Sequence, residues 1–201
     1  MRVLLADYGA GNLRSVASAL ARAGGEPVAS ADPREVREAP LVVIAGVGNA
    51  ASAAAGLAPV ADALRERVAA GRPLLGICVG LQLLFESSEE GGEGLGLLRG
   101  DVRRLRARTV PHMGWNALAA TRPSALLDGL DGEDVYFAHS YAAVPADDVA
   151  TAVVEHDGTL VAAVESGPVA GVQFHPERSG AAGARFLQNA LAWSSAWSRS
   201  A

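Results

Sequence analysis

The feature that most restricts the fold of this chain is a set of short apolar runs, separated by stretches with helical periodicity. Residues 41–45 (L-V-V-I-A) and 73–77 (P-L-L-G-I) carry no charged or polar side chain, and residues 2–6 form a similar run. Strands that are apolar on both faces are typical of parallel sheets covered by helices, because a sheet with one wet face shows alternation instead. The sequence therefore predicts an α/β fold with an open, mostly parallel sheet flanked by helices.

Helical periodicity follows or precedes each run. Apolar residues recur every three or four positions in three stretches, residues 12–23, 59–70 and 79–86. In the second half the connections shorten, which predicts extra antiparallel strands, with candidates at residues 100–105, 135–144, 151–155, 160–165 and 169–174. A final helix is expected over residues 181–194, with Ser179 as its N-cap. We expect one domain over residues 1–201, with residues 196–201 as a frayed tail.

Composition and charge exclude several classes of function. The net charge is −5 and no basic block of the kind that follows phosphates is evident, which argues against nucleic acid as a partner. The N-terminal apolar run ends at Asp7, too soon for a signal sequence or a membrane span. A single cysteine, Cys78, cannot form an internal disulfide and fits a reducing, cytoplasmic location. No Cys/His spacing resembles a zinc site, so neither a metal nor a cofactor is expected.

The strongest chemical signal is at residues 76–80 (G-I-C-V-G), between an apolar strand and an apolar helix. This pattern is the thiol counterpart of the G-x-S-x-G nucleophile elbow. A sharp strand-to-helix turn strains Cys78, and the flanking glycines leave room for the turn. The thiol also lies at a helix N-terminus, which favours the thiolate. A buried structural cysteine is the alternative, and the glycines and the strand–helix context favour the nucleophile.

A candidate base lies near the C-terminus, in residues 171–177 (G-V-Q-F-H-P-E). Pro176 favours an extended backbone, and residues two apart in an extended chain point to the same side. His175 and Glu177 are therefore expected to face one way, with the carboxylate orienting the imidazole. Cys78, His175 and Glu177 would then form a triad of nucleophile, base and orienting group. An isolated His-x-Glu is also compatible with a solvated pair in a loop.

Six motifs together give the chain a family resemblance over residues 7 to about 192. They are residues 7–16 (D-Y-G-A-G-N-L-R-S-V), 46–48 (G-V-G), 76–90 (G-I-C-V-G-L-Q-L-L-F-E-S-S-E-E), 111–116 (P-H-M-G-W-N), 136–141 (Y-F-A-H-S-Y) and 171–180 (G-V-Q-F-H-P-E-R-S-G). The chain resembles the class I glutamine amidotransferases, whose fold is flavodoxin-like. Within them it resembles the glutaminase branch that serves imidazole glycerol phosphate synthase.

The resemblance implies a mechanism and a set of site residues. Cys78 would attack the glutamine amide to form a thioester, with His175 moving protons and Glu177 orienting it. The oxyanion would rest on the backbone N–H groups of Val79 and Val47, where each such donor is worth about 3–4 kcal/mol. The residues matching the family's glutamine-binding positions are Gly48, Gln82, Ser140 and Tyr141.

The resemblance also implies a partner. Ammonium is not a nucleophile, so ammonia released from glutamine must reach its acceptor by a protected path. The family's partner is a cyclase subunit of the (β/α)8-barrel type, which forms a heterodimer with the glutaminase and makes imidazole glycerol phosphate and an aminoimidazole carboxamide ribotide. Residues matching the family's interface are Asn12, Trp115, Tyr136 and Arg178. Judged without the resemblance, Trp115 and Tyr136 could be core residues and Asn12 a helix cap.

Some residues depart from the family pattern and leave alternatives open. Ala45 stands where the family usually has proline, and Asn49 and Ala50 stand where it usually has Ala-Phe. The chain could therefore be a glutaminase-like binding module without turnover. It could also be a glutaminase of another synthase, such as that of pyridoxal phosphate or a specialised pathway, or a generic cysteine hydrolase of the elbow type.

Overall fold

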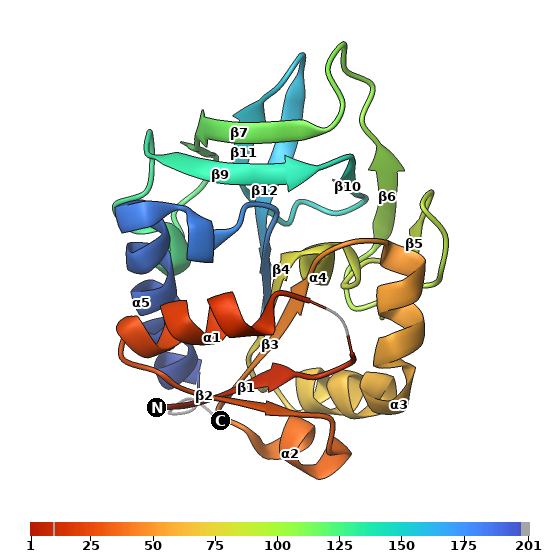
Figure 1. Cartoon of the computed structure of the whole chain (residues 1–201), viewed down its shortest axis with the longest axis vertical. Coiled ribbons are helices and arrows are strands. Elements are labelled where there is room, and N and C mark those ends of the chain that lie inside the picture. The colour runs from red at the N-terminus through yellow and green to blue at the C-terminus, as the bar shows by residue number, and fades with distance from the viewer. Residues whose placement is uncertain (10, 198–201) are drawn as a thin grey trace.

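An eight-stranded sheet forms the centre of the computed structural model, which describes residues 1–9 and 11–197 (Figure 1). Its strand order is β2-β1-β3-β4-β13-β12-β11-β8, and the first five strands are parallel. These strands are β1 (Arg2–Ala6), β2 (Glu26–Ser30), β3 (Leu41–Gly46), β4 (Leu74–Cys78), β8 (Ala119–Ala120), β11 (Ala150–Glu155), β12 (Thr159–Ser166) and β13 (Val169–Val172). The predicted α/β class, with a mostly parallel sheet and extra antiparallel strands, is confirmed.

Two smaller sheets stand above the carboxyl end of the parallel strands (Figure 1). One has the order β10-β6-β5, with β5 (Ser87–Ser88), β6 (Gly100–Arg104) and β10 (Tyr141–Pro145). The other pairs β7 (His112–Ala117) with β9 (Asp134–His139). These sheets form the upper wall of the site described below.

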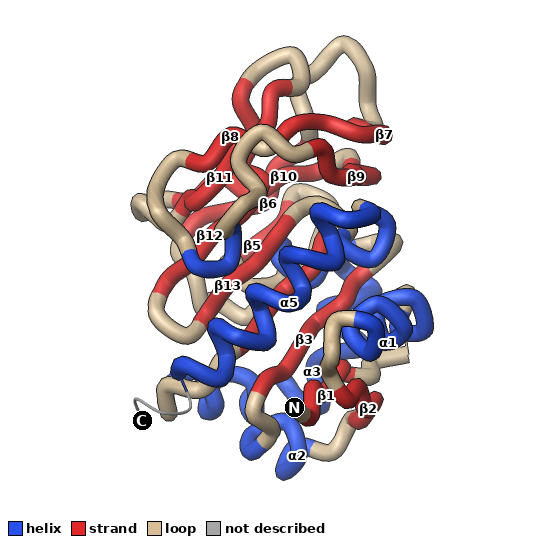
Figure 2. The backbone as a smooth tube through the Cα atoms, turned by 90° about the vertical axis from the view of Figure 1, so that its left-hand side faces the viewer, coloured by secondary structure: helices blue, strands red, loops and turns tan. Residues whose placement is uncertain are grey.

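Helices cover both faces of the central sheet, as Figure 2 shows with α1 and α5 on the near face and α3 behind. The α-helices are α1 (Leu13–Arg22), α2 (Pro33–Glu38), α3 (Ala50–Ala69), α4 (Val79–Gln82) and α5 (Gly180–Trp197), and the 3-10 helices are η1 (Ala125–Leu127) and η2 (Pro176–Arg178). Every residue of β3 and β4 is buried between these layers. That two-sided burial is the physical reason for their continuous apolar sequences.

The prediction of one strand over residues 135–144 is wrong. The chain breaks at Ser140 into β9, which pairs with β7, and β10, which pairs with β6. The pattern of apolar residues runs through the break, because it reports burial and not the identity of the neighbouring strand.

Other differences concern elements with a weak sequence signal. The edge strand β2 is mostly exposed, α2 has six residues and β7 contains a glycine and two exposed apolar side chains, so all three were missed. Helix α3 begins at Ala50, earlier than the predicted residue 59, because the Asn49 carboxamide oxygen accepts from the Ser52 N–H (3.1 Å) and caps the helix. Helix α4 ends at Gln82, earlier than the predicted residue 86.

The position of Ser179 before the final helix is as predicted, and the prediction of the frayed tail needs a correction. Ser179 directly precedes α5, and its hydroxyl donates to the His175 carbonyl (2.7 Å) and accepts from the Tyr136 N–H (2.9 Å). It thus joins the start of α5 to the site strands. Ala196 and Trp197, predicted to fray, belong to α5, where the Trp197 ring lies 6.4 Å from that of Trp193. Residues 198–201 of the predicted tail lie outside the described residues.

A buried arginine joins three connections at the lower end of the sheet. The Arg67 side chain, on α3, is 1% exposed and donates to the carbonyls of Val36, Ala39 (2.9 Å) and Pro73 (2.7 Å). Burial lowers the pKa of Arg67 to about 10, so the guanidinium keeps its charge at neutral pH. Arg67 therefore ties α2 and the starts of β3 and β4 to α3.

Arg67→Ala is expected to lower the free energy of unfolding by more than about 3 kcal/mol, because three buried carbonyls lose their donor and a cavity opens. Urea unfolding followed by circular dichroism measures the loss. Arg34→Ala, an exposed change on α2, is the control and is expected to stay within about 0.5 kcal/mol of wild type. A loss below about 1 kcal/mol for Arg67→Ala would contradict this assignment.

Candidate active site

The turn between β4 and α4 places Cys78 in a backbone conformation that non-glycine residues rarely adopt. Its φ is 54° and its ψ −110°, and among the described non-glycine residues only Asp157 shares a positive φ. The residue is 3% exposed. The predicted strained turn is confirmed, and the role of the thiol remains a prediction.

Three glycines make this turn possible. A Cβ on Gly80 would lie 1.8 Å from the Ile44 carbonyl oxygen, and one on Gly76 would lie 2.5 Å from the Gly80 carbonyl oxygen. A Cβ on Gly46 would lie 2.6 Å from the Cβ of Val79. The start of α4 therefore packs directly on the backbone of β3 and β4, which a side chain at any of these positions would prevent.

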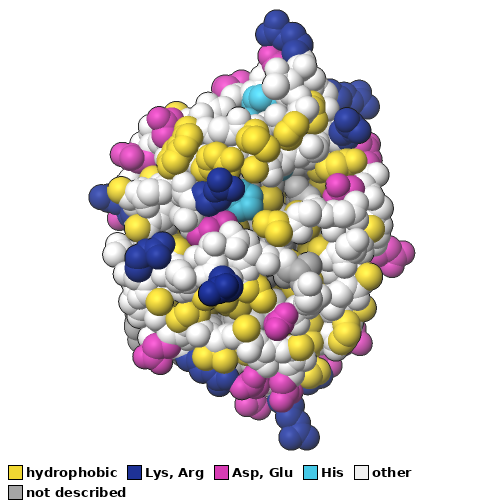
Figure 3. Space-filling model, viewed as in Figure 1, with side chains coloured by type: hydrophobic (Ala, Val, Ile, Leu, Met, Phe, Trp, Pro, Cys, Tyr) yellow, Lys and Arg dark blue, Asp and Glu magenta, His cyan; other side chains and the backbone are white. Residues whose placement is uncertain are grey.

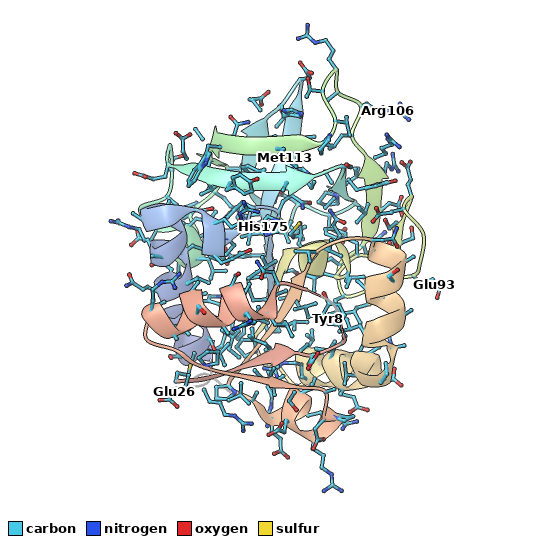
Figure 4. The ribbon with its side chains drawn as sticks, viewed as in Figure 1. Tyr8, Glu26, Glu93, Arg106, Met113 and His175 are labelled. Carbon is cyan, nitrogen blue, oxygen red and sulfur yellow. The ribbon has the colours of Figure 1, made fainter. Side chains whose placement is uncertain are left out.

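His175 and Glu177 follow β13 and face one another as the sequence predicts. The Nδ1 of His175 lies 3.0 Å from Oε1 of Glu177, and both side chains are almost fully buried. His175 is extended (φ −102°, ψ 95°), and Pro176 begins η2 directly after it. The alternative of a solvated pair in a loop is excluded by this burial. Figure 4 shows His175 in the middle of the molecule, below Met113 on β7.

The surroundings of His175 act on its pKa in two directions. Burial lowers the pKa, but hydrogen bonds to Cys78 and Glu177 and the negative charge of both outweigh burial and raise it to about 10. Oε2 of Glu177 is buried and has no hydrogen-bond partner among the described residues, so the carboxylate contacts the imidazole through Oε1. The structure thus brings Cys78, His175 and Glu177 together.

Two glutamines form a polar layer behind the sulfur. The Gln173 side-chain N–H donates to Sγ of Cys78 (3.6 Å), and Gln82 donates to Oε1 of Gln173 (3.2 Å) and to the Tyr141 carbonyl (2.9 Å). Gln173 is fully buried and was not predicted as a site residue. An amide in the otherwise apolar run that precedes His175 was the available signal.

A cavity of about 310 Å³ opens over Cys78. Its lining includes the predicted residues Val47, Gly48, Val79, Gln82, Ser140, Tyr141, His175 and Arg178, and the unpredicted residues Glu90, Pro111, Met113, Ala138 and His139. Glu90 accepts from the Ala50 N–H (2.6 Å) and brings a carboxylate to the cavity. Its place in the F-E-S-S-E-E stretch was the only sequence signal for it.

The loop after β3 is held at both ends despite its departures from the family pattern. The Tyr8 hydroxyl donates to the Ala45 carbonyl (2.9 Å), and the Asn49 side chain caps α3. Burial, aided by the charge of Cys78, raises the pKa of Tyr8 to about 12, so the hydroxyl keeps its proton. Between these ends Gly48 has a φ of 89° and Val47 is exposed.

Three of the four side chains predicted to meet a partner, Trp115, Tyr136 and Arg178, lie together beside the cavity. Trp115 is 56% exposed and Met113 64%, so the alternative that Trp115 is a core residue is excluded. The Arg178 guanidinium lies 4.4 Å over the half-buried Tyr136 ring. Asn12 stands at the N-cap of α1, but its side chain makes no capping hydrogen bond. Figure 3 shows hydrophobic side chains gathered over β7 and β9 on this face.

The family model described as "Glutamine amidotransferase class-I" matches residues 4–193, nearly the whole chain. The chain belongs to the class I glutamine amidotransferases. Similar proteins with curated names agree with this family. "Imidazole glycerol phosphate synthase subunit HisH" of Moorella thermoacetica is 47% identical over 194 residues, covering 93% of this chain and 92% of its own. The subunit of the same name from Geobacillus kaustophilus is 48% identical over 195 residues, covering 91% and 92%.

Solved structures of more distant proteins share the fold of this one. PurLQS from Thermotoga maritima superposes with a TM-score of 0.74 at 23% identity, covering 96% of this chain and 98% of that one. The glutaminase domain of CTPS from Trypanosoma brucei superposes with a TM-score of 0.68 at 17% identity, covering 98% and 94%. At such identities the likeness concerns the fold.

Membrane-spanning helices and metal clusters are both missing from residues 1–9 and 11–197. None of the helices in these residues is both long and apolar enough to cross a membrane. No group of three or more His, Cys, Asp or Glu side chains in the same part of the chain is arranged to hold a metal ion.

Cys78→Ala is expected to lower the pKa of His175 in this amidotransferase. The hydrogen bond and the charge of Cys78 both raise that pKa, whereas burial, which lowers it, remains in the variant. An NMR titration of the imidazole measures the change, with wild type expected to titrate near pH 10. An unchanged pKa in the variant would show that the sulfur and the imidazole do not interact.

Proposed function

We propose that this chain is the glutaminase subunit of an imidazole glycerol phosphate synthase, releasing ammonia from glutamine for histidine biosynthesis. The observation that carries the proposal is the buried group of Cys78, His175 and Glu177 under a cavity, in a chain related along its length to subunits of that name. Residues 1–201 would act as one glutamine amidotransferase domain in the cytoplasm, without a metal or cofactor.

The triad would act by covalent catalysis. Sγ of Cys78 attacks the side-chain amide carbon of glutamine, while His175, which its raised pKa keeps protonated at neutral pH, holds the proton for the leaving group. The oxyanion rests on the backbone N–H groups of Val79 and Val47. His175 then gives its proton to the departing ammonia, leaving a thioester on Cys78. Water, deprotonated by His175, cleaves the thioester to glutamate, while Glu177 keeps the imidazole oriented.

The cavity suits a small zwitterion such as glutamine. Its volume of about 310 Å³ is at the lower end of ligand pockets. We assign Gly48, Gln82, Ser140 and Tyr141 to binding the substrate, and Gln82 also donates to the Tyr141 carbonyl. The carboxylate of Glu90 is the natural partner for the α-ammonium group, because opposite charges attract strongly in a partly buried site.

The face beside the cavity would bind the cyclase partner, which is a (β/α)8-barrel, in a heterodimer. Arg178 lines the cavity, Tyr136 lies under its guanidinium, Trp115 lies beside Tyr136, and Asn12 is the N-cap of α1. Aromatic and arginine side chains are typical interface anchors. A partner seated here would cover the path of ammonia and keep it from protonation. The glutaminase of another synthase, such as that of pyridoxal phosphate, fits the geometry equally well, and the names of the relatives favour the histidine branch.

Cys78→Ala is expected to lower glutamine-dependent product formation with purified cyclase subunit by more than about 10³-fold, because no thioester can form. Ammonium salts are expected to support the cyclase at the wild-type rate, since the acceptor chemistry lies in the partner. Retained glutamine-dependent activity in the variant would contradict the proposal.

A second measurement separates an enzyme from a binding module without turnover. An electrophilic glutamine analogue is expected to label wild-type Cys78 and to leave Cys78→Ala unlabelled, as mass spectrometry can show. A wild-type chain that fails to label in the presence of the cyclase would favour the binding module.

A further inference from the structure

Two buried histidines beside the cavity have no part in the mechanism above. His112 lies on β7 and His139 at the end of β9, and the two residues are paired across the strands. Nδ1 of His112 lies 2.9 Å from Nε2 of His139, and Nδ1 of His139 lies 2.9 Å from the Tyr141 carbonyl oxygen. Nε2 of His112 lies 3.3 Å from the Asn116 side-chain nitrogen. All four ring nitrogens therefore have a protein partner.

The carbonyl oxygen of Tyr141 fixes the direction of this chain of hydrogen bonds. A carbonyl only accepts, so Nδ1 of His139 carries a proton. Burial is the main cause that lowers the pKa of both histidines to about 4, so each is neutral at pH 7 and has one N–H. Nε2 of His139 is then an acceptor, and Nδ1 of His112 is its donor. Nε2 of His112 accepts in turn from Asn116.

Ring packing holds this arrangement in place. The His112 ring is stacked between Phe137, with centroids 4.6 Å apart and an angle of 21°, and His156, at 4.2 Å and 22°. The Asn116 amide is also fixed, because the same nitrogen donates to the Glu155 carbonyl (2.9 Å). Neither imidazole can rotate without losing stacking contacts or a hydrogen bond.

This series of hydrogen bonds continues to the sulfur of Cys78. The Tyr141 carbonyl accepts a second hydrogen bond, from Gln82, which also donates to Gln173, which donates to Sγ of Cys78. A continuous series of hydrogen bonds therefore joins β7 to the thiol. His139 lines the cavity, but with both nitrogens occupied by protein groups it has no free donor or acceptor for a ligand.

We infer that His112 and His139 are positioning residues that hold the Tyr141 carbonyl, and through Gln82 the glutamine-binding wall, in the arrangement that binds substrate. The inference rests on the proposed glutaminase function. Their contribution lies in binding, since Ser140 and Tyr141 line the cavity, whereas His175 is the residue that contacts both Cys78 and Glu177.

Two substitutions at one position test the inference. The amide nitrogen of asparagine can take the place of Nδ1, so His139→Asn keeps the donor to Tyr141. The longer His139→Gln places its amide near Nε2 and removes that donor. In the full complex with cyclase, His139→Gln is expected to raise the KM for glutamine about five- to tenfold, the loss of one net hydrogen bond, with kcat within about twofold. His139→Asn loses only the hydrogen bond from His112, and its KM is expected to rise by about two- to threefold.

A second pair of variants guards against misfolding at His139. His112→Phe keeps the ring stack and removes the donor to Nε2 of His139, while Nδ1 of His139 can still donate to Tyr141, so the KM is expected to rise less than in His139→Gln, by about two- to threefold. His156→Phe keeps the stack on His112 but lies outside the hydrogen-bond chain, and its KM is expected to match wild type. Thermal unfolding and ammonium-supported product formation show which variants are folded and bound to the cyclase.

The outcomes separate this inference from the proposed function. A wild-type chain without glutaminase activity in the complex refutes the proposed function. With an active wild type, the inference is overturned if folded His139→Gln and His112→Phe keep the wild-type KM. It is also overturned if His139→Asn and His139→Gln raise the KM equally, because a purely structural histidine would not distinguish the two amides. If His139→Gln does not fold, His112→Phe compared with His156→Phe decides.

Discussion

Backbone contact between α4 and β3 sets the geometry on which the rest of the site depends. Gly80 lies so close to the Ile44 carbonyl that no side chain fits, and this contact allows Cys78 to take its positive φ. The sulfur is thereby held at the carboxyl end of the parallel strands. His175 lies at the same end because it follows β13, the neighbour of β4 in the sheet. The geometry of this candidate site is therefore set by the order of strands in the sheet, and not by any loop alone.

The buried polar groups around this turn satisfy one another with little redundancy. Gln82, Gln173, His112 and His139 are all buried, and each takes part in at least two hydrogen bonds. Such networks specify one arrangement because an unpaired member is costly in a low dielectric. Beside this network, Oε2 of Glu177 is buried without a hydrogen-bond partner among the described residues. The negative charge of Glu177 lies next to the imidazole and raises the pKa of His175.

The sequence predicted the parts of this structure that leave a local pattern. Continuous apolar runs identified β1, β3 and β4, the glycines around Cys78 identified the elbow, and the two-residue spacing placed Glu177 beside His175. The roles of Gln173, His112 and His139 could not be predicted, because a pattern of burial does not say which polar groups meet across strands. The break at Ser140 escaped for a related reason, since the change from one neighbouring strand to another leaves no mark on periodicity.

That break has a mechanical consequence for the substrate. His139 belongs to the two-stranded sheet and Tyr141 to the three-stranded one, so the pocket wall is a joint between two separately paired units. A tilt of β7 and β9 relative to β6 would change the opening above the sulfur, and the Asn116–Glu155 hydrogen bond would resist it at the end of β11. Force on the exposed side chains of β7 would reach the cavity wall through β9 and Ser140, the single residue that separates β9 from β10.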